Sequence, residues 1–214
     1  MGLSRRISTA FKCDMIRSLL FLVSLGLVAA EDGFAGWLRY ARLPSSEHYH
    51  DSLPSSIIAL NSTPTSPVYV AGAELLKGLE GIFGKQAQIN CNPTSAVILQ
   101  EDGFWLNTKS NTSIQILGQN ERGALYGAFK YLSLIAQGDF TKAATPFNPD
   151  APVRWVNQWD NSDGSIECGY AGSSIFFANG QVLQDLTRVA QYARLLASVR
   201  INGVIVNNVN CSNL

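Results

Sequence analysis

The feature that most constrains the fold is the order of elements after residue 152. An apolar run, VRWVNQW at 153–159, precedes a glycine-rich loop and then a long amphipathic stretch from Gln181 to Arg200. A second apolar run, VIVNNVN, fills 204–210. Apolar residues recur every three or four positions in the amphipathic stretch, which is the spacing of one helix face. The order strand, loop, helix, strand predicts a βαβ unit, because parallel strands need such a crossover connection.

The residues upstream of this unit predict an α+β domain. Hydrophobic patterns predict two helices, at 73–84 and 121–138. Strands are predicted at 37–44, 56–61, 67–72, 95–100, 104–109 and 112–119. The segment TPFNPDAP at 145–152 contains three prolines in eight residues, so it is predicted to be a stiff connector between the two units.

The amino terminus predicts export from the cell. From Met15 the chain has a basic residue, an apolar run at 19–28 and small residues up to Ala30, the three-part pattern of a cleavable signal peptide. The alternative is a membrane anchor, but a bilayer-spanning helix needs about 20 apolar residues, roughly twice the length of this run. We therefore expect residues 1–30 to be a signal, with Met15 as an alternative start. The mature chain is then secreted, begins at Glu31 and has no membrane partner.

Other residue types support export and exclude several kinds of site. Three sequons make Asn61, Asn111 and Asn210 candidate N-glycosylation sites. Three cysteines follow the signal, which allows at most one intramolecular disulfide. The two histidines, at 48 and 50, are predicted to be solvated in a loop, and no metal or cofactor is expected. Sixteen basic and sixteen acidic residues balance, so no nucleic-acid partner is expected.

Polar clusters follow both strands of the predicted βαβ unit. Trp159-Asp160-Asn161 comes after the first strand, and Asn207-Asn208-Val209-Asn210 ends the second. The carboxyl ends of parallel strands meet at one edge, where α/β folds bind ligands. Amides and a carboxylate beside an indole suit a sugar. In the alternative, Asp160 and Asn161 cap the loop and Trp159 fills the core; the residues alone leave both open.

Four longer tracts carry a resemblance to a known family. WVNQWDNSDGSIE-x-GYAG at 155–172 and INGVIVNNVN at 201–210 resemble the start of the catalytic barrel of glycoside hydrolase family 67, the α-glucuronidases. GWLRYARL at 36–43 and ILGQNERGALYGAFKYL at 116–132 resemble its amino-terminal domain. The likeness covers 34–210, and the signal and sequons resemble secreted fungal members.

The resemblance implies a fold, an activity and a substrate. It predicts an α+β domain at 31–150, followed at 151–214 by the first βαβ unit of a (β/α)8 TIM barrel. The implied activity is inverting hydrolysis that releases 4-O-methyl-α-D-glucuronic acid from xylan-derived oligosaccharides. A complete barrel takes about 250 residues, far more than follow Pro152. The sequence is therefore expected to be a truncated, inactive part of the enzyme.

The resemblance also implies substrate-binding positions. Trp159 matches a tryptophan that packs against the uronic acid, and Val209 matches an apolar residue lining the same pocket; Asn161 and Asn208 are further candidates beside them. No catalytic residue is predicted, because Asp160, Asp163 and Glu167 are interpreted as loop-shaping groups.

Cys168 is a departure from the family pattern, which has Arg at that position. Loss of the guanidinium is expected to weaken loop order or substrate contact. A disulfide between Cys168 and Cys211 is a hypothesis. Two other functions stay open: a β-hexosaminidase-like hydrolase, which has a similar plan, and a secreted carbohydrate-binding or non-catalytic glycoprotein.

Overall fold

The computed structural model describes residues 38–58, 63–90, 99–110, 114–167 and 169–208. The predicted signal, the three sequon asparagines, all four cysteines and Val209 lie outside these ranges. The first part of the described chain consists of η1 (Ser46–Ser52), β1 (Ser56–Ile58), α3 (Pro67–Phe83), β2 (Gln88–Asn90), β3 (Phe104–Asn107), β4 (Gln115–Gly118), α4 (Glu121–Ala136) and β5 (Ala144–Phe147). The second consists of β6 (Trp155–Gln158), β7 (Phe177–Ala178), β8 (Gln181–Val182), α5 (Thr187–Ser198) and β9 (Gly203–Val206).

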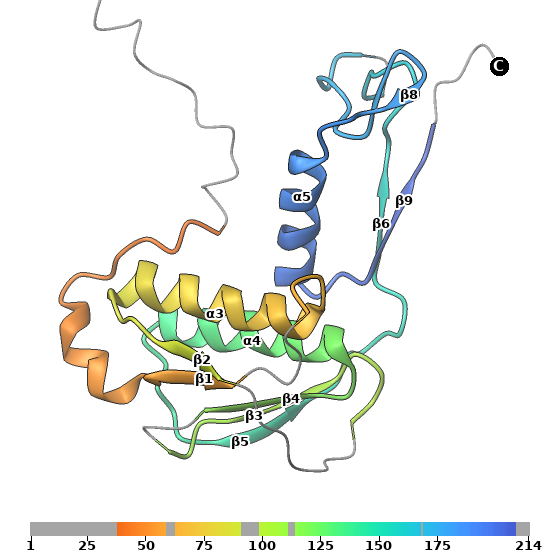
Figure 1. The fold of residues 1–214 in the computed structure, drawn as a ribbon. Helices are drawn as coiled ribbons and strands as arrows, with labels where there is room; N and C mark the ends of the chain where they lie inside the picture. The colour runs from red at the N-terminus through yellow and green to blue at the C-terminus, as the bar shows by residue number, and fades with distance from the viewer. Residues whose placement is uncertain (1–37, 59–62, 91–98, 111–113, 168, 209–214) are drawn as a thin grey trace, which may run out of the picture. The chain divides into compact units, whose positions relative to one another are not determined.

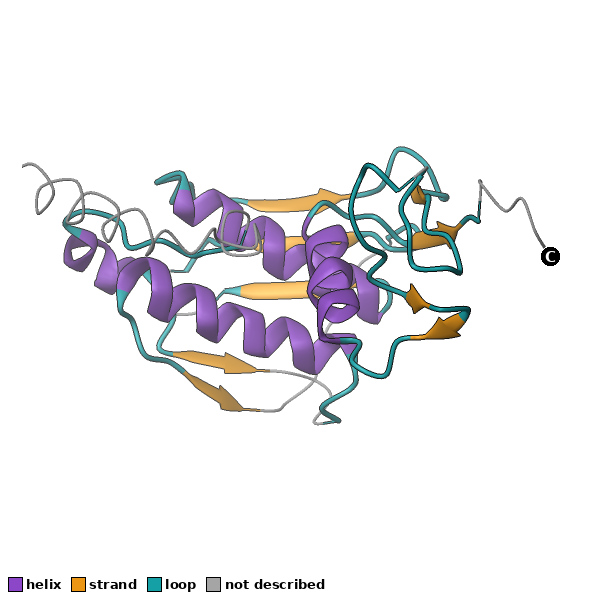
Figure 2. Ribbon diagram, turned by 90° about the horizontal axis from the view of Figure 1, so that it is seen from above, coloured by secondary structure: helices purple, strands orange, loops and turns teal. Residues whose placement is uncertain are grey.

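The first part is an α+β domain, as predicted. Helices α3 and α4 lie side by side, and α4 packs on the antiparallel sheet β4-β3-β5 (Figures 1 and 2). Strands β1 and β2 form a separate parallel pair beside them. Leu79 and Phe83 from α3 meet Leu132 and Ile135 from α4 in the core, and all four are almost fully buried. A Cβ at Gly78 would lie 2.3 Å from Leu132 Cδ2, so the missing side chain lets the helices approach.

Helix α3 begins six residues earlier than the hydrophobic pattern predicts. The predicted strand at 67–72 is wrong: these residues form its first turns. Ser66 is the N-cap, its Oγ accepting a hydrogen bond from Val68 N at 3.1 Å, and Pro67 takes the first helical position, where no amide donor is needed. The Ser-Pro pair therefore starts a helix here, although it looked like a turn before a β-rich run.

Two further segments differ from prediction near the amino-terminal end of the domain. Residues 38–44 form no strand. Tyr40 has a left-handed backbone (φ 50°), and Leu43 N donates to Ile82 O at 3.0 Å, so the segment follows the end of α3 instead of a sheet. The histidine loop is the 3-10 helix η1. His48 is exposed as predicted, but His50 Nε2 donates to Phe83 O at 2.7 Å, which contradicts simple solvation.

The predicted connector also contributes to the sheet. Residues 144–147 form β5, which pairs with β3 and places Pro146 opposite Trp105. Proline lacks an amide donor. However, β5 is an edge strand, and a backbone amide that points away from the sheet needs no hydrogen-bond partner in a neighbouring strand. The three prolines therefore rule out a central strand at these positions, but they allow an edge strand.

The second part contains the predicted βαβ unit. Strands β6 and β9 pair in parallel, with register from Trp155 opposite Gly203 to Gln158 opposite Val206, and α5 lies between them in the chain. The helix is shorter than predicted, because Gln181 and Val182 pair with Phe177 and Ala178 in a hairpin. Asn179 and Gly180, both with positive φ, form its turn, an Asn-Gly hairpin signal that lies just before the predicted stretch.

Candidate functional site

The polar clusters after β6 and β9 lie at one edge, as predicted. We call residues 159–161 and 207–208 the rim. The parallel register places the ends of both strands together, and Asn207 N donates to Gln158 O at 2.7 Å, one step beyond β9. Trp159 is 43% exposed, and Asn208 is exposed. The rim therefore presents an indole and an amide from neighbouring strands.

Asp160 is the anchor of the loop that follows β6. Its side chain is completely buried. Oδ1 accepts a hydrogen bond from Gln158 Nε2 at 2.6 Å, and Oδ2 accepts from Ser174 Oγ at 2.6 Å and from Ile175 N at 3.1 Å. The carboxylate thus joins the end of β6 to the far side of the loop, fourteen residues on. This arrangement matches the loop-capping alternative for Asp160.

Asn161 folds the near side of the loop. Its Nδ2 donates to Ser165 Oγ at 2.9 Å and to Glu167 O at 2.6 Å, while its backbone N donates to Ser165 O at 2.8 Å. The residue is 4% exposed. Its amide nitrogen is therefore used within the loop, and a role in substrate binding stays a prediction.

The other two carboxylates of the loop, Asp163 and Glu167, lie in turns. Asp163 Oδ1 accepts from Ser165 N at 2.8 Å and from Ser165 Oγ at 2.7 Å, and these hydrogen bonds lower the pKa of its exposed carboxyl. Glu167 and Gly164 have positive φ, so both residues shape turns. The contacts and backbone conformations described for Asp163 and Glu167 are therefore those of turn-shaping groups.

Helix α5 supports the rim from one side through Tyr192. Its hydroxyl donates to Gln158 Oε1 at 3.0 Å. Burial, together with the negative charge of Asp160, raises the pKa of Tyr192. The phenol therefore stays protonated and keeps donating at neutral pH. Gln158 connects this phenol to the Asp160 carboxylate, so the helix and the loop hold each other.

Sequence reasoning missed a buried carboxylate, Asp102, in the turn just before β3. The raising effect of burial on the pKa of Asp102 is outweighed by hydrogen bonds from Asn120, Asn202, Arg122 and Arg154, which bring it to about 2. The donors stand 18, 100, 20 and 52 residues away in sequence. No local pattern brings such residues together, so the sequence offered no signal beyond the Asp-Gly pair at 102–103.

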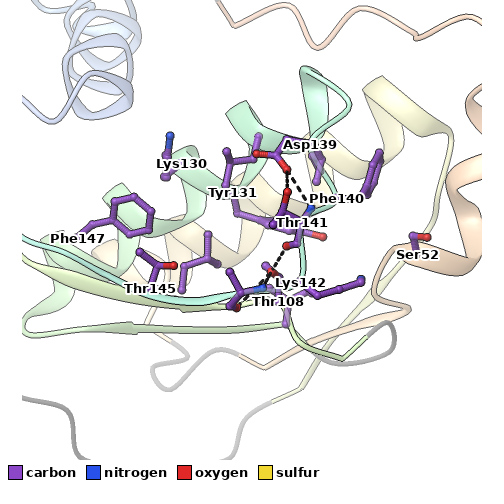
Figure 3. Close-up of a pocket in the computed structure, with 15 residues that line it drawn as sticks. Ser52, Thr108, Lys130, Tyr131, Asp139, Phe140, Thr141, Lys142, Thr145 and Phe147 are labelled. Atoms are coloured by element: carbon purple, nitrogen blue, oxygen red, sulfur yellow. Dashed lines mark hydrogen bonds between the residues drawn. The ribbon is translucent and has the colours of Figure 1, made fainter.

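A separate cavity of about 240 Å³ lies between α4 and strands β3 and β5 (Figure 3). Phe140 and Phe147 line it, and Lys130 Nζ lies 5.7 Å from the Phe147 ring centre. Three of its polar residues bond to one another: Thr141 donates to the Asp139 carboxylate, and Thr108 Oγ1 donates to Thr141 O at 2.6 Å. Its lining residues come from positions 52 to 147 and include none of the rim residues. They include one carboxylate, so the cavity does not resemble a site for acid and base catalysis.

The described residues include neither a metal-binding cluster nor a membrane-spanning helix. No group of three or more His, Cys, Asp or Glu side chains there is arranged to hold a metal ion. No helix among them combines the length and apolar character needed to cross a membrane.

Comparison with protein families gives matches along the chain. The model of the glycosyl hydrolase family 67 N-terminus matches residues 36–99 and 90–131, and that of the family 67 middle domain matches 134–214. A "Probable alpha-glucuronidase A" of Aspergillus fumigatus is 53% identical over 213 residues, which cover 89% of this chain and 25% of the relative. The protein of the same description from Aspergillus terreus is 54% identical over 224 residues, covering 92% of this chain and 26% of the relative.

Among solved structures, a family GH115 4-O-methyl-alpha-glucuronidase with specificity for decorated arabinogalactans matches with a TM-score of 0.48 and 16% identity. The match covers 71% of this chain and 25% of that one. A likeness of this extent adds nothing to the assignment. This chain spans about a quarter of the length of the curated relatives that it matches.

Proposed function

This chain belongs to glycoside hydrolase family 67, and from that premise we propose that the whole protein of which it forms a part is an α-glucuronidase. One observation carries the proposal: identity of 53% across 89% of this chain to a relative described as an α-glucuronidase. The proposed substrate is a xylan-derived oligosaccharide that carries (4-O-methyl)-α-D-glucuronic acid. The proposed reaction is hydrolysis that releases this acid with inversion.

The reaction sets requirements that the described residues meet only in part. An inverting glycosidase uses a carboxylic acid to protonate the leaving oxygen and a carboxylate to activate water, roughly 6.5–9.5 Å apart. The buried Asp160 is bonded on both oxygens and Asp163 is held in a turn, so neither is suited to these roles. We propose that the pair belongs to the part of the protein that corresponds to the remaining length of its relatives. This 214-residue chain is then expected to release no uronic acid alone.

The contribution of this chain is one side of the substrate pocket. We propose that β6, α5 and β9 are the first βαβ unit of a (β/α)8 barrel, with the rim at its catalytic end. The exposed Trp159 indole offers an apolar face for the C–H side of the uronic acid ring. Asn161, Asn208 and Val209 line the same pocket in this proposal. The parallel register of β6 and β9 supports it, because that register brings both strand ends to one edge.

Secretion and glycosylation belong to the same proposal. The signal pattern at 1–30 suits an extracellular enzyme of polysaccharide breakdown, and Asn61, Asn111 and Asn210 would carry N-glycans. Amino-terminal sequencing of the protein from culture medium tests the first point, with Glu31 as the expected first residue. Mass loss after enzymatic removal of N-glycans tests the second.

The activity is tested with the full-length protein and an aldouronic acid, a xylooligosaccharide bearing terminal 4-O-methylglucuronic acid. Proton NMR during the reaction should show the β-anomer of the released acid first, because inversion changes the α-linkage to a β-hydroxyl. Release of the α-anomer first would overturn inversion. Binding of the oligosaccharide without turnover would favour a carbohydrate-binding glycoprotein instead.

Trp159 gives a residue-level test of the pocket. Trp159→Ala removes the stacking face, and we expect a fall in kcat/KM of about tenfold or more. Trp159→Phe keeps an aromatic face and should lose less. Equal loss in both variants, or none in either, would remove Trp159 from the proposed pocket.

A further inference from the structure

Asp102 joins the α+β domain to the βαβ unit through its two carboxylate oxygens. Its side chain is 1% exposed. Oδ1 accepts hydrogen bonds from Asn120 Nδ2 at 2.9 Å and Arg122 Nε at 2.8 Å, at the start of α4. Oδ2 accepts from Arg154 Nη2 at 3.0 Å and Asn202 Nδ2 at 2.9 Å. One oxygen therefore faces the domain and the other faces the βαβ unit.

The two residues bound to Oδ2 immediately precede the two parallel strands. Arg154 is followed by β6, and Asn202 is followed by β9. They also bond to each other: Arg154 N donates to Asn202 Oδ1 at 2.9 Å, and Asn202 N donates to Arg154 O at 2.9 Å. The carboxylate thus fixes both strands at the point where they begin.

The Arg154 guanidinium is bound at each of its nitrogens, which leaves it little freedom. Nε donates to Arg200 O at 2.7 Å and Nη1 donates to Ala151 O at 2.6 Å, while Nη2 reaches Asp102. The group also lies 5.8 Å from the ring centre of Tyr126, whose hydroxyl donates to Ile201 O at 3.1 Å. Because the planar guanidinium is hydrogen-bonded at all three nitrogens, its orientation is fixed as well as its position.

The strand pair has weak means of setting its own register. Each strand has four residues, and Trp155, Val204, Ile205 and Val206 are substantially exposed, so burial in the described chain does little to fix which residues face each other. A slip of one residue would turn every side chain of a strand to the opposite face. Hydrogen bonds that hold the residue before each strand to a fixed group outside the strand pair would prevent such a slip.

We propose that Asp102 is a positioning residue that sets the register of β6 against β9. Through that register, and resting on the proposed function, it determines how Trp159 and Asn208 face the substrate at the other end of the strands. It acts through Arg154 and Asn202 and does not itself touch the substrate.

The test uses this 214-residue chain and amide hydrogen exchange measured by mass spectrometry. Asp102→Asn is the informative variant, because asparagine has the same size and also tolerates the left-handed backbone of this position (φ 61°). It removes the charge and one acceptor oxygen. We expect exchange in 155–158 and 203–206 to become about tenfold faster, with exchange in α4 changed less than about twofold.

Glu101→Gln is the matched control. Glu101 is the adjacent carboxylate, its side chain is 73% exposed, and it pairs with Arg122 at 3.3 Å. This variant should leave exchange in both strands unchanged. An effect equal to that of Asp102→Asn would mean that loss of any carboxylate near Arg122 is enough to speed exchange in the strands. That result would overturn the proposal.

Arg154→Lys provides a second measurement, should Asp102→Asn fold poorly. Lysine keeps the charge but cannot reach all three acceptors, so exchange should rise in the same two strands. Unchanged strand exchange in this variant, or equal acceleration in α4, would also overturn the register role.

These results do not depend on turnover: a full-length wild-type protein that releases no uronic acid would refute the proposed function alone. In an active full-length enzyme, Asp102→Asn should lower kcat/KM more than Glu101→Gln.

Discussion

Glu74 on α3 accepts two hydrogen bonds from the guanidinium of Arg194 on α5, 120 residues further along the chain. Their side chains are only 7% and 15% exposed. Tyr40 completes the group: its hydroxyl donates to Glu74 Oε1 at 2.8 Å, and its ring centre lies 5.5 Å from the guanidinium. Burial, reinforced by the charge of Glu74, raises the pKa of Tyr40, so the phenol remains a donor. This buried group ties α5 to the α+β domain.

Removal of the Glu74 carboxylate should strongly destabilise the chain. Glu74→Ala leaves the Arg194 charge buried without its partner, which costs about 3 kcal/mol or more. Urea unfolding measures the loss. Glu80→Ala, an exposed glutamate on the same helix, should change the free energy of unfolding by less than about 0.5 kcal/mol. The double change Glu74→Ala with Arg194→Met should recover part of the loss, and additive effects in that cycle would contradict a direct pairing.

Stability should fall in acid through Asp102. The folded pKa, about 2, lies below the ordinary value of 3.8, so the stabilisation is complete above pH 4 and is lost as pH falls towards 2. Its size is about 2 kcal/mol. The charged groups facing this carboxylate are the guanidinium groups of Arg122 and Arg154, with Glu101 beyond Arg122.

Unfolding by urea at several pH values from 2 to 5 checks this pH dependence. Asp102→Asn should be less stable than wild type at pH 5, and the difference should shrink as pH falls. A constant difference over this range would show that Asp102 has the same pKa in the folded and the unfolded state. That result would contradict the depressed pKa of the folded state.

Gly123 should not tolerate a side chain. A Cβ there would lie 2.3 Å from Gly103 O, a backbone atom that cannot turn away. We expect Gly123→Ala to cost about 2 kcal/mol, despite the better helix propensity of alanine. Gly127 on the same helix is the control: its Cβ would first meet Ile116 Cγ2, at 2.4 Å, and a side chain can shift. Thermal unfolding should rank Gly123→Ala clearly below Gly127→Ala, and the reverse order would refute the packing argument.

The loop after β6 should open when Asp160 is lost. Asp160→Ala leaves buried Ser174 Oγ and the Ile175 amide without their acceptor, at a cost of about 2 kcal/mol. Limited proteolysis should then cleave between residues 161 and 176 at least several-fold faster. Asp185→Asn, an exposed aspartate just before α5, is the matched control and should leave the cleavage rate of this loop unchanged. Equal resistance of Asp160→Ala and wild type would contradict the anchoring role.

Local patterns predicted several elements and failed at others for identifiable reasons. Periodicity predicted α4, and Asn120 caps it by accepting a hydrogen bond from Gly123 N at 2.8 Å, an interaction spanning three residues. The same periodicity extended α5 too far, because Gln181 and Val182, at the start of the predicted stretch, pair with Phe177 and Ala178 across the Asn179-Gly180 turn. The strand at 67–72 failed because the Ser66 cap outweighed β-rich composition.

The sequence by itself determined the α+β domain, the order β6, α5, β9, the common edge of Trp159 and Asn208, and, through its motifs, the family. These features depend on periodicity, caps and short motifs, which act over a few residues. Only the tertiary structure decided that Asp102 and Glu74 would be buried and bound by arginines 20 to 120 residues away. A carboxylate in a sequence looks the same whether it is solvated or buried, because burial depends on which distant segments pack around it.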